Sequence, residues 1–313
     1  MSIKIITPGL MTSVQDCGRY GYQASGFSVS GALDMRSYKL ANILAGNIEN
    51  LAVLEMTMLG ITAEFTQNTV FAITGGDFTP TINGESINMY QTVYASAGDV
   101  LKMGAAKTGS RAYIAFLGGV DVPLVMGSRS TNMKCKIGGF EGRALRAGDV
   151  IETGDNFPID YRKKVKKIKP DDFSSSEAEI RVILGPQDDY FTEKGIDTFL
   201  SSPYTLTKDC DRMGFKLDGE KIENINGVDI VSDGIALGSV QVPSSGKPII
   251  MLADRQTTGG YAKIATVVSV DIPRLVQLKS GSTVHFKEVT AKEAEKLYKA
   301  EQHEYEKLMF RIF

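Results

Sequence analysis

Between Ala52 and Phe116 the chain is a succession of short apolar runs separated by glycine-bearing turns. Runs this short and this closely spaced are typical of strands in an antiparallel barrel or sandwich. A doubly wound parallel sheet would require strands that alternate with long helices, and no such alternation is present. We therefore predict a mainly β fold, with strands at Val53–Met58, Thr62–Phe65, Val70–Thr74 and Tyr113–Leu117.

Length and composition limit the classes of protein to consider. The 313 residues suffice for two domains or one large one, and 42% hydrophobic residues suffice for a substantial core. The formal net charge of -2 offers no basic surface for nucleic acid, so we expect no nucleic-acid partner. No apolar run is long enough to span a membrane, and no signal peptide is expected at the N-terminus.

The three cysteines, Cys17, Cys135 and Cys210, are widely spaced and odd in number. They form neither a disulfide framework nor a Cys-x-x-Cys metal site, and this usage favours a reducing compartment. We therefore expect the protein in the cytoplasm.

Two helices carry start signals in the sequence. Asp34 is a good N-cap for a helix over Met35–Ala45, and Gly46 is placed to end it. Near the C-terminus, Thr290 and Glu293 form a capping box for a helix with an apolar face.

A change of composition suggests where the chain divides. Ile159–Glu179 is a basic run followed by proline, aspartates and serines, which we interpret as a solvated linker. We place the domain boundary there, giving a first domain of residues 1–165 and a second of residues 166–313. A turn glycine before a strand recurs three times, at Gly98, Gly148 and Gly281, which suggests two related domains or one turn type recurring by chance.

The stretch Val228–Asp271 is the strongest candidate for a binding site. Two strand-like runs, Gly238–Val242 and Pro248–Ala253, precede the polar segment Asp254–Tyr261, and another run, Ile264–Val270, follows it. Polar side chains at the end of a buried strand, followed by glycines, are rigidly based and leave the backbone open to a ligand. The alternative is a solvated turn with a structural Asp–Arg pair.

Two segments of the first domain are weaker candidates. Gln15, Asp16 and Arg19 lie in a glycine-punctuated polar loop that either faces a ligand or is held by an internal Asp16–Arg19 contact. Arg129 and Arg143, in and beside the glycine-dense Gly118–Gly142, could anchor a carboxylate or phosphate, or be surface arginines.

Several catalytic systems are not expected. The histidines are His285 and His303 alone, so a Ser-His-Asp or Cys-His nucleophile is not predicted, and no His/Cys cluster predicts a metal. Neither standard nucleotide-binding loop is present, so we expect any ATP to be bound with the help of a partner protein. Lys134 is followed by Cys135 rather than the methionine of a biotinyl-lysine motif. What remains are Asp, Arg, Gln and Lys side chains, which suit a small amide or carboxylate.

Several motifs together resemble one known family. They are GLMTSVQDCGRYGY, GALDMRSYKLAN, VLEMTMLG, GGVDVPLVMGSRST, GGFEGRALRAGD, GPQDDYF, DRMGFKLDG and SDGIALGSVQVPSSGKPIIMLADRQTTGGYAKIATV. The chain resembles the KipA family, also called the allophanate hydrolase subunit 2 or biotin-dependent carboxyltransferase family, which includes the C component (PxpC) of 5-oxoprolinase. The resemblance extends to about Phe286.

The resemblance implies a fold of two cyclophilin-like β-barrel domains, to which the chain adds short helices and a C-terminal helix. It implies one component, inactive alone, of a bacterial ATP-dependent 5-oxoprolinase that cleaves 5-oxoproline to glutamate. The implied partners are a KipI-like protein, which is the B component of 5-oxoprolinase, and an A component of the lactam-utilisation type.

Two alternatives stay open. One is a carboxyltransferase component of a urea carboxylase or allophanate hydrolase type of system, the only alternative that uses biotin. The other is a KipA-type regulator that binds and antagonises a KipI-like kinase inhibitor.

The resemblance also implies one ligand pocket, with the catalytic residues Asp254, Gln256, Lys263 and Arg212. We expect Arg212 to hold a carboxylate, Asp254 and Gln256 to orient an amide or lactam, and Lys263 to meet developing negative charge. The expected substrate-binding residues are Asp211, Gln241, Arg255, Thr257, Thr258, Gly259 and Gly260, with Gln15, Asp16, Arg19, Arg129 and Arg143 as additions from the first domain.

Overall fold

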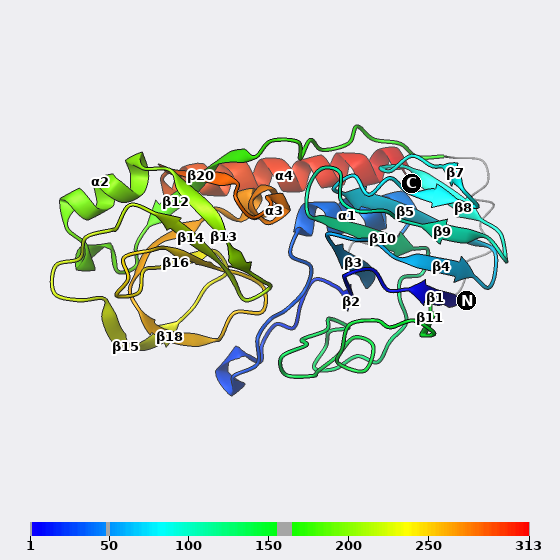
Figure 1. Cartoon of the computed structure of the whole chain (residues 1–313), viewed down its shortest axis with the longest axis horizontal. Coiled ribbons are helices and arrows are strands. Elements are labelled where there is room, and N and C mark those ends of the chain that lie inside the picture. Colours follow the sequence, from blue (N-terminus) through cyan, green and yellow to red (C-terminus); the bar gives the residue numbers. More distant parts are fainter. Residues whose placement is uncertain (1, 48–50, 155–164, 313) are drawn as a thin grey trace. The chain divides into compact units, whose positions relative to one another are not determined.

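The computed structural model describes residues 2–47, 51–154 and 165–312, and it divides into two compact units (Figure 1). Unit 1 comprises Met1–Arg19, Ser30–Ser174 and Glu304–Phe313, and unit 2 comprises Tyr20–Val29 and Ser175–His303. The predicted mainly β fold with a C-terminal helix is confirmed. The predicted boundary between residues 165 and 166 stays a prediction.

Unit 1 contains two antiparallel sheets. The first has the order β11-β1-β4-β9-β6-β7, and the second has the order β2-β3-β10-β5-β8. The strands of the first sheet are β1 (Ser2–Thr7), β4 (Thr62–Phe65), β6 (Thr81–Ile82), β7 (Glu85–Ser86), β9 (Val100–Lys102) and β11 (Val150–Glu152). Those of the second are β2 (Met11–Gln15), β3 (Val53–Thr57), β5 (Thr69–Gly75), β8 (Thr92–Ala95) and β10 (Arg111–Phe116).

The second sheet is buried on both faces. Every residue of β5 and β10 is buried, and alternate side chains of a strand point to opposite faces. On one face, Ile73 and Ile114 pack in a core with residues of the first sheet such as Ile5. On the other, Tyr113 packs with the apolar side of α1 (Met35–Ala45).

Helix α1 begins and ends where its caps predict. The Asp34 carboxylate accepts from the Ser37 N–H at 2.8 Å, and Gly46 ends the helix with a φ of 90°. The end of α4 (Ala291–Ile312) packs on it within unit 1: Arg36 is paired with Glu304, and the Lys39 ammonium lies 4.8 Å from the Tyr305 ring centroid.

At the other end of α4 the predicted capping box is present. The Thr290 N–H donates to Glu293 Oε2 at 2.8 Å, and the Glu293 N–H donates to Thr290 Oγ1 at 3.2 Å. The two side chains thus satisfy each other's main-chain donors at the start of the helix.

Unit 2 is built on a closed barrel of order β12-β19-β16-β17-β14-β13-β20. Its pairings are antiparallel except for β12 with β20. Its strands are β12 (Glu177–Leu184), β13 (Tyr204–Cys210), β14 (Gly214–Gly219), β16 (Ser239–Gln241), β17 (Ile249–Met251), β19 (Lys263–Val267) and β20 (Thr283–Glu288). Accompanying it are α2 (Glu193–Ser201), α3 (Ile272–Gln277), and the short helices η1 (Gln23–Ser25), η3 (Asp188–Tyr190) and η4 (Ser269–Asp271).

A separate two-stranded ribbon, β15 (Asp229–Gly234) with β18 (Thr258–Tyr261), completes unit 2. The prediction that the polar segment Asp254–Tyr261 is a loop between two core strands is wrong for its second half. Thr258–Tyr261 is extended because it pairs with β15, and no local pattern signals such pairing.

The interpretation of Ile159–Glu179 as a solvated linker is also wrong for part of its length. Its first six residues lie outside the described part of the chain. The Lys166 carbonyl accepts from the Thr92 N–H at 2.9 Å, and the Ile168 N–H donates to the Tyr90 carbonyl at 3.1 Å. Glu177–Glu179 already belong to strand β12. Main-chain bonds thus hold described residues of the segment that composition marks as solvated.

A buried aromatic cluster stabilises unit 2 and gives a stability prediction. Phe199 on α2 is fully buried, and its ring stacks on Phe286 with centroids 4.4 Å apart. Replacing Phe199 with Ala removes that contact and leaves a cavity, so we expect the free energy of unfolding to fall by ~3–5 kcal/mol. Urea titration followed by fluorescence and circular dichroism measures the loss.

The matched control is Val231→Ala, because Val231 is 93% exposed. Its effect on stability should stay within about 0.5 kcal/mol. An equal loss in both variants would contradict the assignment of Phe199 to the core.

Candidate functional site

A buried ion pair joins two turns of the barrel in unit 2. Arg212 precedes β14 and Asp254 follows β17, and these strands pair antiparallel. The Arg212 Nε–H donates to Asp254 Oδ2 at 2.9 Å and the Nη2–H to Oδ1 at 3.2 Å. The side chains are 4% and 7% exposed, and the Asp254 N–H also donates to the Arg212 carbonyl at 2.8 Å.

This geometry bears on the role expected for Arg212. A guanidinium facing a carboxylate with two parallel bonds is a strong and directional contact. Neither charge of a buried pair is easily left alone, because each has lost its water. The expectation that Arg212 holds a ligand carboxylate stays a prediction, and the Asp254 carboxylate already occupies this face of the guanidinium.

Lys263 and Gln241 are cross-strand neighbours in the barrel. They are register partners on β19 and β16, and both side chains are buried. The Lys263 ammonium donates to Asp233 Oδ2 at 2.9 Å, and its main-chain N–H donates to Gln187 Oε1 at 3.1 Å. The bond from Lys263 lowers the pKa of the Asp233 carboxyl below its ordinary value. A buried ammonium therefore meets an exposed carboxylate on the ribbon.

Two amide side chains come together at Gly259. A Cβ on this glycine would lie 2.9 Å from Gln241 Nε2 and 3.6 Å from Gln256 Nε2. It would also lie 2.7 Å from the Ile235 Cδ1 atom, closer than side chains tolerate. The absence of a side chain at residue 259 thus lets the amides of Gln241 and Gln256 approach the same point, with Gln241 buried and Gln256 exposed.

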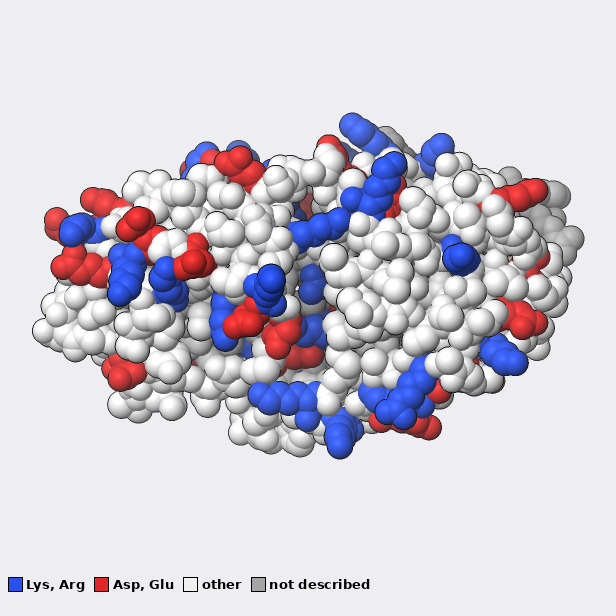
Figure 2. Space-filling view, viewed as in Figure 1, with Lys and Arg blue, Asp and Glu red and all other residues white. Residues whose placement is uncertain are grey.

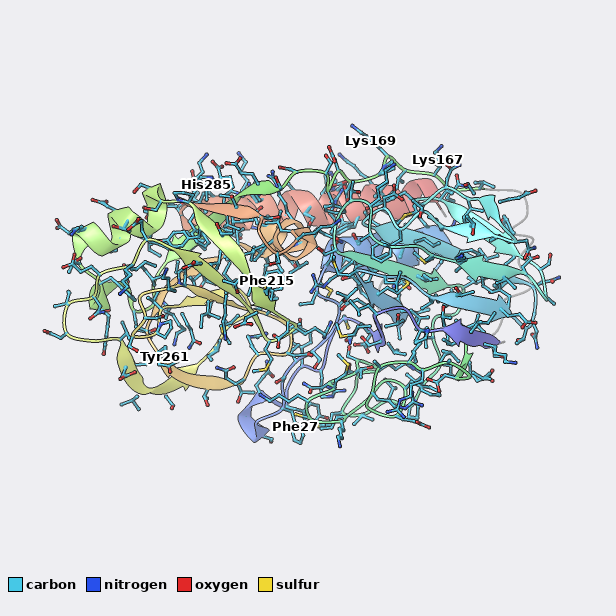
Figure 3. The ribbon with its side chains drawn as sticks, in the orientation of Figure 1. Phe27, Lys167, Lys169, Phe215, Tyr261 and His285 are labelled. Atoms are coloured by element: carbon cyan, nitrogen blue, oxygen red, sulfur yellow. The ribbon has the colours of Figure 1, made fainter. Side chains whose placement is uncertain are left out.

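The rest of the predicted unit 2 set lies on the same turns. Arg255 is half-buried and donates to the Ile235 and Leu252 carbonyls. Asp211 is exposed, and its Oδ1 accepts from the Met213 and Gly214 N–H groups, which shapes its own turn. The last three, Thr257, Thr258 and Gly260, form the approach to the ribbon and part of β18; Tyr261, which ends that strand, is labelled in Figure 3.

Asp16 organises a loop cluster within unit 1. Its carboxylate is buried and accepts from the N–H groups of Gly18 at 2.8 Å and Arg129 at 2.5 Å, and from the hydroxyls of Ser128 and Ser130. Four donors on one carboxylate leave little capacity for a ligand. The contacts fit a loop-holding role, and the predicted binding role of Asp16 stays a prediction.

The other predicted unit 1 residues are also bonded locally. The buried Gln15 amide nitrogen donates to Ser13 Oγ and the Thr131 carbonyl, and Arg19 donates to the Val125 and Ser130 carbonyls. Arg129 pairs with Asp121 at 3.3 Å, and Arg143 pairs with Asp149 at 2.7 Å and with Glu141 at 2.8 Å. The two arginines predicted as anion anchors thus have carboxylate partners in their own loops.

Three residues at the site, Asp233, Gln187 and Ser28, are not singled out by any sequence pattern used above. Gln187 follows the end of β12, in the same way that Asp254 follows β17, so strand-end position is the signal that could have found it. Asp233 lies on the ribbon, which the sequence does not predict. Ser28 Oγ donates to the Arg255 carbonyl at 2.7 Å, across 227 positions of sequence, and no local pattern signals that contact.

The chemistry available in unit 2 is polarisation and orientation of a small polar molecule. Among residues 2–47, 51–154 and 165–312, no cluster of three or more His, Cys, Asp or Glu side chains could hold a metal ion. In the same residues no helix is long and apolar enough to cross a membrane. Positive and negative side chains are interspersed on the face shown in Figure 2.

Residues 25–288 match the family model described as the carboxyltransferase domain, subdomain A and B. The chain belongs to this carboxyltransferase domain family. The matched region contains the barrel, the ribbon and every unit 2 residue discussed above.

Full-length relatives of this carboxyltransferase chain are 5-oxoprolinase C subunits. It is 36% identical to the 5-oxoprolinase C subunit of Escherichia coli over 99% of this chain and 98% of that protein. It is 36% identical to the Haemophilus influenzae protein of the same name over 94% of each. The urea amidolyase of Saccharomyces cerevisiae is 31% identical over 91% of this chain, which covers 16% of that protein.

Solved structures give the same fold to the urea-processing relatives. The K. lactis urea amidolyase matches with a TM-score of 0.90 and 29% identity over 98% of this chain and 20% of that one. The Kluyveromyces lactis urea carboxylase matches with a TM-score of 0.89 and 29% identity over 98% of this chain and 29% of that one.

The Arg212–Asp254 pair gives a prediction for stability. Arg212→Leu leaves the Asp254 carboxylate buried and uncompensated, so we expect a loss of ~3–5 kcal/mol in the free energy of unfolding. Replacing both residues with Leu should recover part of the loss, because no buried charge remains. Chemical unfolding of the single and double variants makes the measurement.

Lys216→Ala is the control for this comparison, since Lys216 and Asp209 form an exposed pair, 55% and 71% exposed. Its cost should not exceed about 1 kcal/mol. A single Arg212 variant as stable as Lys216→Ala would show that the buried pair contributes nothing.

The Lys263–Asp233 contact gives a pH prediction. The folded pKa of Asp233 lies below its ordinary value of 3.8, so the contact contributes stability above that pH. The contribution is lost as the pH falls through the lowered pKa. In Lys263→Met the Asp233 pKa should rise, and carboxyl ¹³C NMR titration measures it.

Lys287→Met is the matched control, because Lys287 bonds Glu179 and not Asp233. The Asp233 titration should be the same in this variant as in the unaltered chain. An Asp233 pKa that is unchanged in Lys263→Met would assign the shift to another cause.

Proposed function

We propose that this chain is the C component of an ATP-dependent 5-oxoprolinase that cleaves the lactam of 5-oxoproline to give glutamate. The observation that supports this most is reciprocal coverage: the match to the E. coli C subunit takes in 99% of this chain and 98% of that protein. The urea amidolyase match takes in 16% of a much larger protein. The C subunit is thus a relative whose extent equals that of this chain.

In this proposal the chain works with two partners. A KipI-like B component and a lactam-utilisation-type A component complete the complex, and the chain is inactive without them. ATP is bound with their help, because the sequence contains neither standard nucleotide-binding loop. A cytoplasmic location is consistent with this use of ATP.

The polar groups of unit 2 are assigned to the lactam. The Gln241 and Gln256 amides, which converge at Gly259, orient the ring amide through its N–H and carbonyl. The Lys263 ammonium stabilises the negative charge that develops on the carbonyl oxygen when the amide is attacked. Asp254, held by Arg212, fixes the turn that presents Gln256.

A second candidate function is supported by the structural comparison. The TM-score of 0.90 to urea amidolyase and the carboxyltransferase family model favour transfer of a carboxyl group to an amide such as urea. In that case biotin would arrive on a separate carrier. Both functions require a site that positions an amide, so the substrate decides between them.

Reconstitution tests the proposal. We expect glutamate release from 5-oxoproline only when this chain, the A and B components, and ATP are all present, as measured by coupled glutamate assay. Gln256→Ala should lower kcat/KM by roughly 10- to 1,000-fold, because an orienting and charge-stabilising amide is lost. Lys287→Ala, a surface change, is the matched control and should retain full turnover.

Three outcomes can be told apart in this assay. Full turnover in Gln256→Ala would remove that residue from the site. Complex formation without turnover of 5-oxoproline would contradict the oxoprolinase function. Carboxylation of urea from a carboxylated biotin carrier would then support the second candidate.

A further inference from the structure

Arg255 differs from the paired arginines of the structure. Its guanidinium is half-buried, and its partners are two main-chain carbonyls, those of Ile235 at 2.9 Å from Nε and Leu252 at 3.2 Å from Nη1. Among the described residues, no carboxylate lies within ion-pair distance of it. Carboxylates pair with four other partly or fully buried arginines: Arg36, Arg143, Arg181 and Arg212.

The position of Arg255 is fixed on several sides. Its own N–H donates to the Leu252 carbonyl at 3.1 Å, the same oxygen that receives Nη1. Its carbonyl accepts from Ser28 Oγ at 2.7 Å. Ile235, which accepts from Nε, is itself held by a bond from its N–H to the Thr257 carbonyl at 3.0 Å. The cation is therefore set in place before any ligand binds.

A fixed cation without an acid retains unused donors. A guanidinium has five N–H groups, and the bonds to Ile235 and Leu252 use two of them. Burial lowers the pKa of the Arg255 guanidinium, an effect that the Tyr20 phenol partly offsets. Charge without compensation is unfavourable in a partly dehydrated place, and a bound anion would supply the compensation.

Ile235 connects Arg255 to the amide groups. Its carbonyl accepts from Arg255, and its Cδ1 atom lies at the place where a side chain of Gly259 would begin. The amide nitrogens of Gln241 and Gln256 approach that same place. One residue thus separates a cation with free donors from two convergent amides.

We propose that Arg255 is a carboxylate subsite, so that unit 2 takes small molecules that carry a carboxylate beside an amide. This inference rests on the proposed function and sharpens it, because 5-oxoproline has both groups and urea has only the amide. It assigns the carboxylate to Arg255 rather than to Arg212, whose guanidinium is bonded to Asp254.

Side-chain NMR of the full chain with ¹⁵N-labelled arginine tests the subsite directly. The Arg255 Nε–H signal is identified by its loss in Arg255→Gln. Acetate and 5-oxoproline should shift this signal to saturation, whereas acetamide should leave it in place. An Arg255 signal that neither carboxylate moves would overturn the proposal.

Binding of matched ligands gives an independent measure. Arg255→Gln should weaken 5-oxoproline binding by roughly 10- to 100-fold, the worth of a hydrogen bond to a charged group. Binding of 2-pyrrolidinone, the same ring without the carboxylate, should be unchanged, and this also shows that the variant is folded. The exposed Arg274→Gln is the control and should bind both ligands as the unaltered chain does.

The outcome separates this inference from the proposed function. If carboxylates shift the Arg255 signal but the reconstituted complex does not turn over 5-oxoproline, the subsite stands and the oxoprolinase function fails. If the complex is active and Arg255→Gln binds 5-oxoproline as tightly as before, the function stands and the subsite is wrong.

Discussion

The buried ion pair between Arg212 and Asp254 is the contact on which the candidate site in unit 2 depends. It closes the turn after β17 against the turn before β14, and a main-chain bond between the same two residues reinforces it. Arg255 and Gln256 follow directly in sequence. Their side chains can be presented at fixed positions because Asp254 cannot leave without separating two charges that have lost their water.

Unit 1 uses a carboxylate for a similar purpose with different donors. Asp16 gathers main-chain N–H groups and serine hydroxyls, so its charge is satisfied without a partner guanidinium. The loop can close this tightly because glycine occupies its crowded positions. A Cβ at Gly138 would lie 2.3 Å from the Ser130 carbonyl oxygen and 2.6 Å from Arg19 Nη2. Glycine density in this loop therefore reflects packing around Asp16.

Local signals predict the parts of the fold that are locally determined. The Asp34 and Gly46 caps predict the observed bounds of α1, and the Thr290–Glu293 box predicts the start of α4. Strand β4 is also predicted correctly, since alternation and turn glycines are properties of neighbouring residues. Helices α2 and α3 are short, and the sequence patterns predict neither. The candidate site, in turn, is predictable as a set of residues but not as an arrangement. The Arg212–Asp254 bond spans 42 positions, and the ribbon joins β15 to β18 across the barrel strands between them. Such pairings depend on the whole chain having folded, so no window of sequence reveals them.

The discontinuous make-up of the two units has a consequence for biosynthesis. Tyr20–Val29 leaves the ribosome early but belongs with Ser175–His303, and Phe27 within it is labelled in Figure 3. The final residues, Glu304–Phe313, belong with the earliest-made part of the chain. Neither half can therefore reach its finished form while translation continues, and a truncated nascent chain would leave both incomplete.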